Sequence, residues 1–338
     1  MLSLELRCRQ EEMYSNGILE WKGTFDEVPV PVERLQIRSI LCPVDFSDFS
    51  HRAVCYAASL ARHFGSRLFI QHIAIPGPYP FMAGLNSDVG LPGIEAQLRG
   101  AREGILRMLR AAGIATSEVT VLLNEGDVTA SILETTRKEG IDLLVMGTHG
   151  HKGFNRLFLG SVAEAVIHQA ICPVLVVSRP APHLEQGEVS FNTIVLATDF
   201  STHSDRALAY ALRWGCEWCS QVVLFHAVEA PAPVLRGMVD LFPEYNPYFE
   251  RQVAIAWDHL RDLVPETTRE WCQVVYDVRH GNPKDEILRV AEEKGANLVI
   301  TGARGVGNSG TSWGSVSSAV VRDGRFPTLV VRELPPQP

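Results

Sequence analysis

Three glycines and a serine form the part of the sequence best suited to bind an anion. Gly147 and Gly150 are separated by two residues, and Gly160-Ser161 follows Gly150 after nine more. Glycines let the backbone turn tightly and approach a ligand closely. We expect Gly160-Ser161 to open a helix, whose first N–H groups have no partner within the helix and therefore bind anions such as phosphate. The spacing predicts a phosphate-binding loop.

Charged residues in this loop favour a polyphosphate ligand. Lys152 and Arg156 lie between the second and third glycines and would neutralise phosphate charge, while His149 would add a hydrogen bond. Two alternatives stay open. The glycines could serve only as turn residues and a helix entry, and Ser161 with Glu164 matches a capping box that would use the same N–H groups.

A second, altered copy of the pattern lies near the C-terminus. Gly302, Gly305 and Gly314-Ser315 repeat the order, but eight residues rather than nine separate the second glycine from the third. The shorter loop contains no Lys or Arg, which leaves Arg304 as the sole nearby cation. Because a helix end offsets only about half a charge, we expect this copy to bind a polyphosphate more weakly.

An internal duplication explains why the pattern occurs twice. Three segments recur at a spacing of 154 or 155 residues: 40–47 as 194–201, 144–147 as 299–302, and 172–177 as 326–331. Matches in register over a whole unit indicate a repeated domain. We divide the chain into an N-terminal extension (1–36), a first domain (37–178), a linker (179–190) and a second domain (191–334). An Asn16-Gly17 turn predicts a small hairpin in the extension, with a loosely attached tail as the alternative.

Each repeat alternates short β-branched runs with helical patterns, which is typical of an α/β fold with a parallel sheet and helices on both faces. In the first repeat we expect strands near 37–44, 67–75, 118–124, 142–147 and 173–178, and helices near 48–64, 93–112, 127–139 and 161–170. In the second we expect strands near 193–198, 221–228, 272–279, 297–302 and 327–332. Ligands bind such open sheets beyond the carboxyl ends of the strands. The final strands begin with Pro173 and Pro327 and are apolar, so we expect them to pack against each other.

Composition excludes several classes of protein. With 338 residues, 46% of them hydrophobic, the chain can form two globular domains. No stretch of about 18 apolar residues is present, and the N-terminus has no secretory signal, so we expect a cytoplasmic protein without membrane contact. The net charge of −8, with cations and carboxylates interspersed, argues against nucleic acid as a partner.

The glycine motif, Gly-x2-Gly-x9-Gly-Ser, resembles the ATP-binding signature of the universal stress protein family. The resemblance extends to residues 43–47 (PVDFS), 72–73 (HI), 160–164 (GSVAE) and 172–177 (CPVLVV), and covers about 37–178 and 193–332. It implies a five-stranded parallel sheet with strand order 3-2-1-4-5 in each repeat. Tandem members are similar to a dimer made within one chain, so we expect an intrachain pseudo-dimer that could dimerise again.

The resemblance also implies a role for individual residues. It assigns the adenosine end of ATP to Pro43, Asp45, Ile73 and Met146, and the phosphates to Gly147, His149, Gly150, Gly160, Ser161 and Val162, with Gly126 as a further family position. The corresponding residues of the second repeat are Asp199, Ala227, Gly302, Arg304, Gly305, Gly314 and Ser315. Asp45 could instead cap the helix that begins near Asp48.

We therefore expect a non-catalytic, nucleotide-dependent stress regulator that binds ATP or another adenine nucleotide in its first repeat. The alternative is a slow ATPase or a self-phosphorylating protein, although the sequence has neither a Walker motif nor a kinase catalytic loop. We expect no metal held by protein ligands alone, since no Cys or His spacing suits one. Mg or Mn would be carried by the ATP phosphates.

Overall fold

The computed structural model describes residues 36–75, 94–148, 159–178, 188–229, 246–264, 272–303 and 314–332. The hairpin expected in the N-terminal extension lies outside these ranges. Within them, no helix is both long and apolar enough to cross a membrane.

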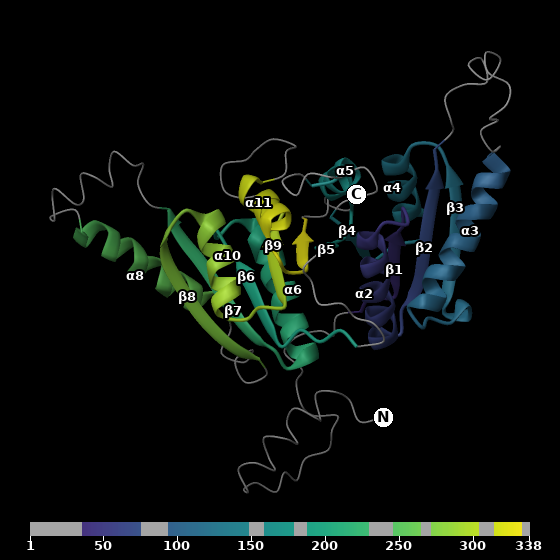
Figure 1. Cartoon of the computed structure of the whole chain (residues 1–338). Helices are drawn as coiled ribbons and strands as arrows, with labels where there is room; N and C mark the ends of the chain where they lie inside the picture. Colours follow the sequence, from purple (N-terminus) through teal and green to yellow (C-terminus); the bar gives the residue numbers. More distant parts are fainter. Residues whose placement is uncertain are drawn as a thin grey trace, which may run out of the picture. The chain divides into compact units, whose positions relative to one another are not determined.

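The first repeat alternates strands and helices in the expected order (Figure 1). Its strands consist largely of β-branched residues and leucines, which the helices bury in β1, β2, β4 and β5 but only partly in the edge strand β3. Two of its helices begin at side-chain caps, Ser47 and Asp127. The elements are β1 (Ser39–Pro43), α2 (Asp48–Phe64), β2 (Arg67–Ala74), α3 (Ile94–Ala111), the 3-10 turn η3 (Thr116–Glu118), β3 (Val119–Glu125), α4 (Val128–Lys138), β4 (Leu143–Gly147), α5 (Ser161–Gln169) and β5 (Val174–Val177).

The second repeat has the same succession of elements. Ser201 and Asn282 cap two of its helices, at positions equivalent to Ser47 and Asp127. The elements are β6 (Thr193–Ala197), α6 (Thr202–Trp218), β7 (Gln221–Glu229), α8 (Asn246–Asp262), β8 (Gln273–Gly281), α10 (Pro283–Glu293), β9 (Leu298–Gly302), α11 (Ser315–Asp323) and β10 (Thr328–Val331).

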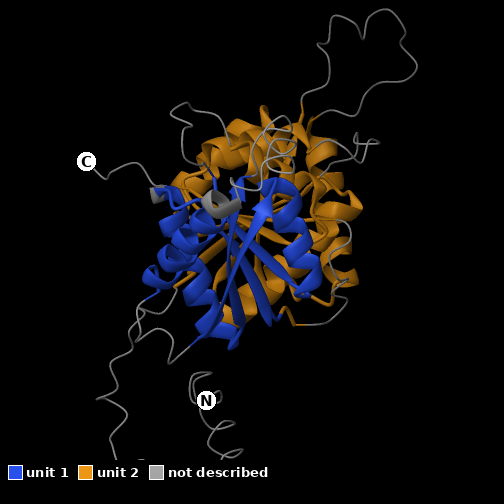
Figure 2. Ribbon diagram, turned by 90° about the vertical axis from the view of Figure 1, so that its left-hand side faces the viewer, with its two compact units in different colours: residues 1–35, 190–306 blue, residues 36–189, 307–338 orange. Residues whose placement is uncertain are grey.

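Strand order confirms the predicted fold class. In the first repeat the strands lie in the order β3-β2-β1-β4-β5 and all pair in parallel. In the second repeat β8-β7-β6-β9 follow the same order, also in parallel. Helices cover both sides of the sheet, as Figure 2 shows for the strands drawn in blue. The chain changes winding direction between the first and fourth strands, where ligands of such sheets bind.

The last strands of the two repeats pair with each other, as predicted. β10 runs antiparallel to β5, with Leu329 opposite Leu175. All residues of both strands are buried, so the pairing covers apolar edges that would otherwise face water. As a result the compact units of the structure do not follow the sequence repeats. Residues 36–189 and 307–338 form one unit, and residues 190–306 belong to the other (Figure 2).

Candidate functional site

The predicted adenosine-side residues of the first repeat lie at the carboxyl ends of three neighbouring strands. β1 lies between β2 and β4 and ends at Pro43. Ile73 is near the end of β2 and Met146 near the end of β4, and both are buried. The topology therefore brings together residues that are up to about a hundred positions apart in the sequence, at the edge where an open parallel sheet binds its ligand.

Asp45 follows β1 directly and is held by the residue that caps the next helix. Its Oδ1 accepts hydrogen bonds from the backbone N of Ser47 at 3.0 Å and from Ser47 Oγ at 2.6 Å. Ser47 Oγ in turn accepts from Ser50 N at 3.2 Å and so caps α2. The alternative that Asp45 itself caps this helix is therefore wrong. Asp45 orients the capping serine and keeps its own carboxylate at the end of the strand.

Gly147, at the end of β4, is required by packing whether or not a ligand is bound. A Cβ at this position would lie 2.7 Å from Phe49 Cβ and 2.9 Å from the Phe49 carbonyl carbon. Only a glycine lets the first turn of α2 approach the strand this closely. Part of the glycine pattern thus has the purely structural explanation left open above.

The third glycine of the motif stands at the positive end of α5. Gly160 is the N-cap residue, and its N–H donates to the Thr148 carbonyl oxygen at 2.8 Å, which closes the base of the loop between them. No side chain of the described residues caps this helix. The predicted capping box is therefore wrong: Ser161 is the first helical residue rather than the cap. Ser161 is exposed and Val162 half-buried.

Gly126 follows β3 and adopts a φ of 117°, which favours glycine. Its N–H donates to the Ala74 carbonyl oxygen at 3.0 Å, and the next residue, Asp127, caps α4. This glycine therefore ties the end of β3 to the end of β2. The remaining predicted residues of this site, His149, Gly150, Lys152 and Arg156, lie outside the described part of the chain.

The second repeat places the corresponding residues in the same way. Asp199 Oδ1 accepts from Ser201 N at 3.1 Å and from Ser201 Oγ at 2.6 Å, and Ser201 caps α6. Gly314 is the N-cap of α11, again with no side-chain cap among the described residues, and Ser315 begins the helix. Ala227 is half-buried near the end of β7. Arg304 and Gly305 lie outside the described ranges.

Gly302 is packed less tightly than its counterpart Gly147. A Cβ on Gly302 would lie 3.2 Å from the His203 carbonyl carbon and 3.3 Å from Ser204 N. These distances require a neighbour to move by only a few tenths of an ångström. The second repeat therefore leaves slightly more room between its fourth strand and the helix that follows its first.

Two aromatic residues in left-handed backbone conformation are functional candidates that sequence reasoning missed. Phe46 has a φ of 66° and Phe200 a φ of 61°, a conformation that costs a side-chain-bearing residue about 1–2 kcal/mol. Each ring packs on a histidine: Phe46 lies 4.7 Å from His72, and Phe200 lies 4.4 Å from His226, between ring centroids. The sequence contains a sign of this pairing, because in both repeats a histidine lies 26 positions after the phenylalanine.

The polar side chains of the sheet that contact helices α4 and α10 differ between the two repeats. In the first, Gln71 is fully buried, and its Nε2 donates to Asn124 Oδ1 at 3.0 Å and to Thr135 Oγ1 at 2.8 Å. The second repeat has Phe225 in place of Gln71 and Arg279 in place of Asn124.

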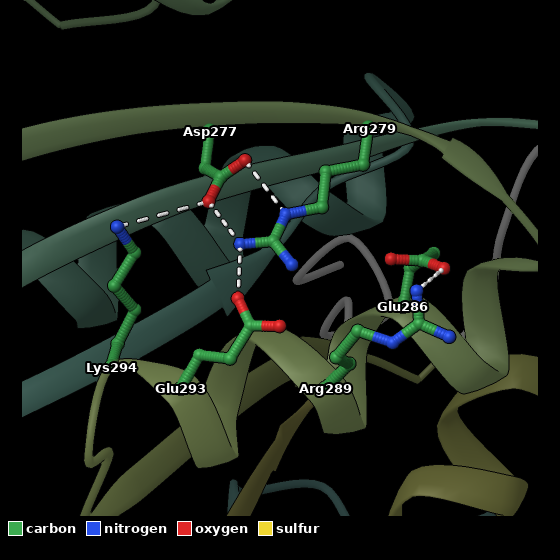
Figure 3. Close-up of polar contacts among 6 residues, drawn as sticks. All are labelled: Asp277, Arg279, Glu286, Arg289, Glu293 and Lys294. Carbon is green, nitrogen blue, oxygen red and sulfur yellow. Dashed lines mark hydrogen bonds and ion pairs between the residues drawn. The ribbon is translucent and has the colours of Figure 1, made fainter.

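Arg279 belongs to an ionic network on β8 and α10 (Figure 3). Its guanidinium donates to both carboxylate oxygens of Asp277, at 3.1 and 2.9 Å, and pairs with Glu293 at 2.8 Å. Hydrogen bonds to these carboxylates raise the pKa of Arg279, and the bond to Arg279 lowers the pKa of Glu293. Lys294 approaches Asp277 at 4.0 Å. The network is structural in form, because each charge in it has a partner of opposite sign.

No group of three or more Cys, His, Asp or Glu side chains suited to a metal ion occurs among the described residues.

Comparison with known proteins identifies the repeats. A model of the universal stress protein family matches residues 36–178 and again residues 190–332. A universal stress protein of Methanocaldococcus jannaschii is 33% identical over 144 residues, which are 42% of this chain and 83% of that protein. One from Mycolicibacterium smegmatis is 26% identical over 303 residues, 87% of this chain and 96% of that protein. The solved structure of a universal stress protein from Archaeoglobus fulgidus has a TM-score of 0.61 at 22% identity and covers 89% of this chain and 98% of that chain.

Proposed function

The chain belongs to the universal stress protein family, and from this premise we propose that it binds ATP in its first repeat and acts as a non-catalytic, nucleotide-dependent stress regulator. The loaded and empty states would differ in the surface that the loop after β4 offers to other proteins. Such a switch requires only that ATP binds one state more tightly than the other.

The uncapped N-terminus of α5 is the observation that carries the proposal. Gly160 has a φ of −60° and a ψ of 136°, which any residue can adopt, so its backbone does not require a glycine. A Ser, Thr or Asp at this position would satisfy an N–H group of the first turn. The glycine leaves these N–H groups to another acceptor and lets it approach closely, which suits a phosphate.

Asp45 supplies the second half of the argument. A carboxylate accepts hydrogen bonds only, so it suits the donor groups of an adenosine. The bonds from Ser47 to Oδ1 help to orient the group. We propose that Asp45 accepts from donors of the adenosine, while the Ile73 backbone meets the adenine edge. Base and phosphates would then lie along the carboxyl ends of β2, β1 and β4.

The phosphates would bring a divalent cation with them. ATP carries close to four negative charges, and a helix end supplies about half a positive charge. Lys152 and Arg156 would neutralise part of the remainder. We propose that Mg or Mn, bound to the phosphate oxygens, supplies the rest.

The proposal is tested by the fate of the nucleotide. Purified protein incubated with radiolabelled ATP and Mg should retain ATP through gel filtration and release no phosphate over several hours. Release of phosphate, or covalent label on the denatured protein, would instead favour the slow ATPase or the self-phosphorylating protein. The same assay on Gly160→Asp is the control for label that the protein carries without binding it at the proposed site. This variant should elute without label.

A further inference from the structure

We infer that Phe46 and His72 are positioning residues that hold Asp45 in the orientation in which it receives adenosine. The inference rests on the proposed function, since it concerns the residues behind the same site. Neither side chain needs to touch the ligand for this role. What they control is the backbone on both sides of Asp45.

The residue before Asp45 is fixed to the neighbouring strand. Val44 N donates to the Gln71 carbonyl oxygen at 2.8 Å, and the Val44 carbonyl oxygen is 2.8 Å from His72 Nδ1. Because a carbonyl only accepts, Nδ1 must carry the hydrogen of this bond. Val44 is also buried. Both of its backbone polar groups are therefore held by β2, and one of the two bonds depends on the His72 side chain.

The residue after Asp45 is fixed by its ring. Phe46 keeps its left-handed backbone only because the surroundings hold it there, and such strain concentrates at functional sites. On one side its ring packs on His72. On the other it lies against helix α3 at Gly104, where a Cβ would come within 2.8 Å of Phe46 Cε1. His72 thus supports both neighbours of Asp45, one through a hydrogen bond and one through ring contact.

Asp45 is in this way ordered before any ligand arrives. Its backbone is held on either side, and Ser47 sets the direction of its carboxylate. A ligand that binds such a group does not have to order it, which raises affinity. If Val44 and Phe46 were released, the carboxylate would still be present but would sample several directions.

The second repeat builds the same arrangement from different neighbours. The Thr198 carbonyl oxygen is 2.9 Å from His226 Nδ1, and Phe200 packs on the His226 ring. In α8, the helix that follows the second strand of this repeat, the ring of His259 meets Phe200 edge-on at 5.4 Å. The histidine and the strained phenylalanine are thus common to both repeats although the helix residue facing them is not. In both repeats this histidine and phenylalanine flank the aspartate that follows the first strand.

The experiment separates a positioning role from a role in folding alone. His72→Phe keeps a ring beneath Phe46 but removes the hydrogen bond to Val44, whereas His72→Asn removes the ring but places an N–H donor where Nδ1 was. Binding of ATP and of inorganic tripolyphosphate is measured by calorimetry on each folded variant. We expect His72→Phe to weaken ATP binding about tenfold, the loss of one well-placed hydrogen bond. Tripolyphosphate, which does not reach Asp45, should bind within about twofold of wild type.

His72→Asn should recover at least half of the lost ATP affinity on a logarithmic scale. Ile132→Val, a fully buried change in α4 away from this turn, provides the control for lost stability and should leave both affinities unchanged. If His72→Phe does not fold, Gly104→Ala takes its place, since the added methyl group displaces the Phe46 ring while helix propensity improves.

Three results would overturn the inference while leaving the proposed function intact. These are unchanged ATP affinity in folded His72→Phe, an equal loss of ATP and tripolyphosphate affinity, and an Asn variant as weak as the Phe variant. Wild-type protein that binds tripolyphosphate or nothing, but not ATP, would overturn the proposed function itself and the inference with it.

Discussion

The chain makes the same turn after β1 and after β6, whereas the polar side chains of the sheet that contact α4 and α10 differ between the two repeats. Both turns place an aspartate at the strand end, a capping serine two residues later and a strained phenylalanine between them. Under the helices, the first repeat has a buried glutamine bonded to Asn124, and the second has a guanidinium between Asp277 and Glu293.

This difference distinguishes the residues that the candidate site keeps in both repeats from the residues that packing allows to vary. The turn depends on backbone hydrogen bonds, a capping serine and a residue with left-handed backbone, and both repeats build it from the same residue types. The contacts with the following helix are less demanding, because an amide bonded to Asn124 and Thr135 in one repeat and paired charges in the other both occur beside it. Duplicated domains can therefore diverge in charge while the frame of the ligand site stays constant. The following predictions ask whether binding has diverged as well.

The largest effect is expected from Gly160→Asp. An aspartate at this N-cap would accept from the first turn of α5, which stabilises the helix by about a few tenths of a kcal/mol relative to glycine but places a negative charge where phosphate would bind. ATP affinity should fall about a hundredfold or more, while the melting temperature stays the same or rises. Calorimetry and thermal unfolding measure the two. A folded variant with unchanged ATP affinity would show that the site is assigned to the wrong residues.

Gly314→Asp makes the same change at the N-cap of α11 and tests whether the second repeat contributes to ATP binding. If ATP binds mainly to the first repeat, this variant should gain similar stability and lose little of the total binding.

The two wild-type sites should differ in affinity about tenfold or more, because the second loop lacks counterparts of Lys152 and Arg156 and each lost charge contact removes about 1–3 kcal/mol. Arg304 is always charged and offsets part of the deficit. Equilibrium dialysis should return one tight ATP per chain. Two equivalent ATP molecules, or nucleotide in the second repeat alone, would contradict the expectation.

Alanine at the glycine that ends each fourth strand should distinguish the repeats by stability. Gly147→Ala brings a Cβ within 3.0 Å of Phe49 backbone, whereas Gly302→Ala meets His203 at 3.2 Å. We expect losses of about 2 and about 1 kcal/mol respectively. Both changes lower the entropy of the unfolded chain alike, so that term cancels. Urea unfolding compares the two variants, and equal losses would mean that the closer packing in the first repeat carries no energetic cost.

The smallest effect concerns His226. Burial lowers its pKa, with His259 acting in the same direction and the Thr198 carbonyl and Asp199 opposing it. The unfolded chain therefore binds this proton at a higher pH than the folded chain, and stability falls as the pH drops below about 6.5. His226→Asn keeps a donor to Thr198 but cannot titrate, so the acid-induced loss should shrink. Unfolding at pH 8, where the histidine is neutral in both states, gives the cost of the substitution itself. An identical pH dependence in both proteins would contradict the assignment.

Much of this molecule could be predicted from residue patterns. The periodicity of apolar residues placed the strands of both repeats and the four helices of the first repeat within about two residues, because each element has a buried face that its own sequence records. The errors concerned caps. Ser161 with Glu164 has capping-box spacing, yet the cap lies one residue earlier, at Gly160, and Ser161 is the first residue of the helix. For α2 the cap is Ser47 rather than Asp45. A cap is set by the residue at which the backbone leaves the extended conformation, and that depends on the preceding strand.

The sequence by itself determined the duplication, the parallel sheet and the residues that reach its carboxyl edge, because these follow from spacing and hydrophobicity along one chain. Only the tertiary structure decided why Gly147 must be a glycine, how His72 and Phe46 meet around Asp45, and which side chains partner Gln71 and Arg279. Each of these is a contact between residues of separate elements. Such contacts depend on how closely two elements approach and which side chains face each other, and neither is recorded in the spacing of residues within one segment.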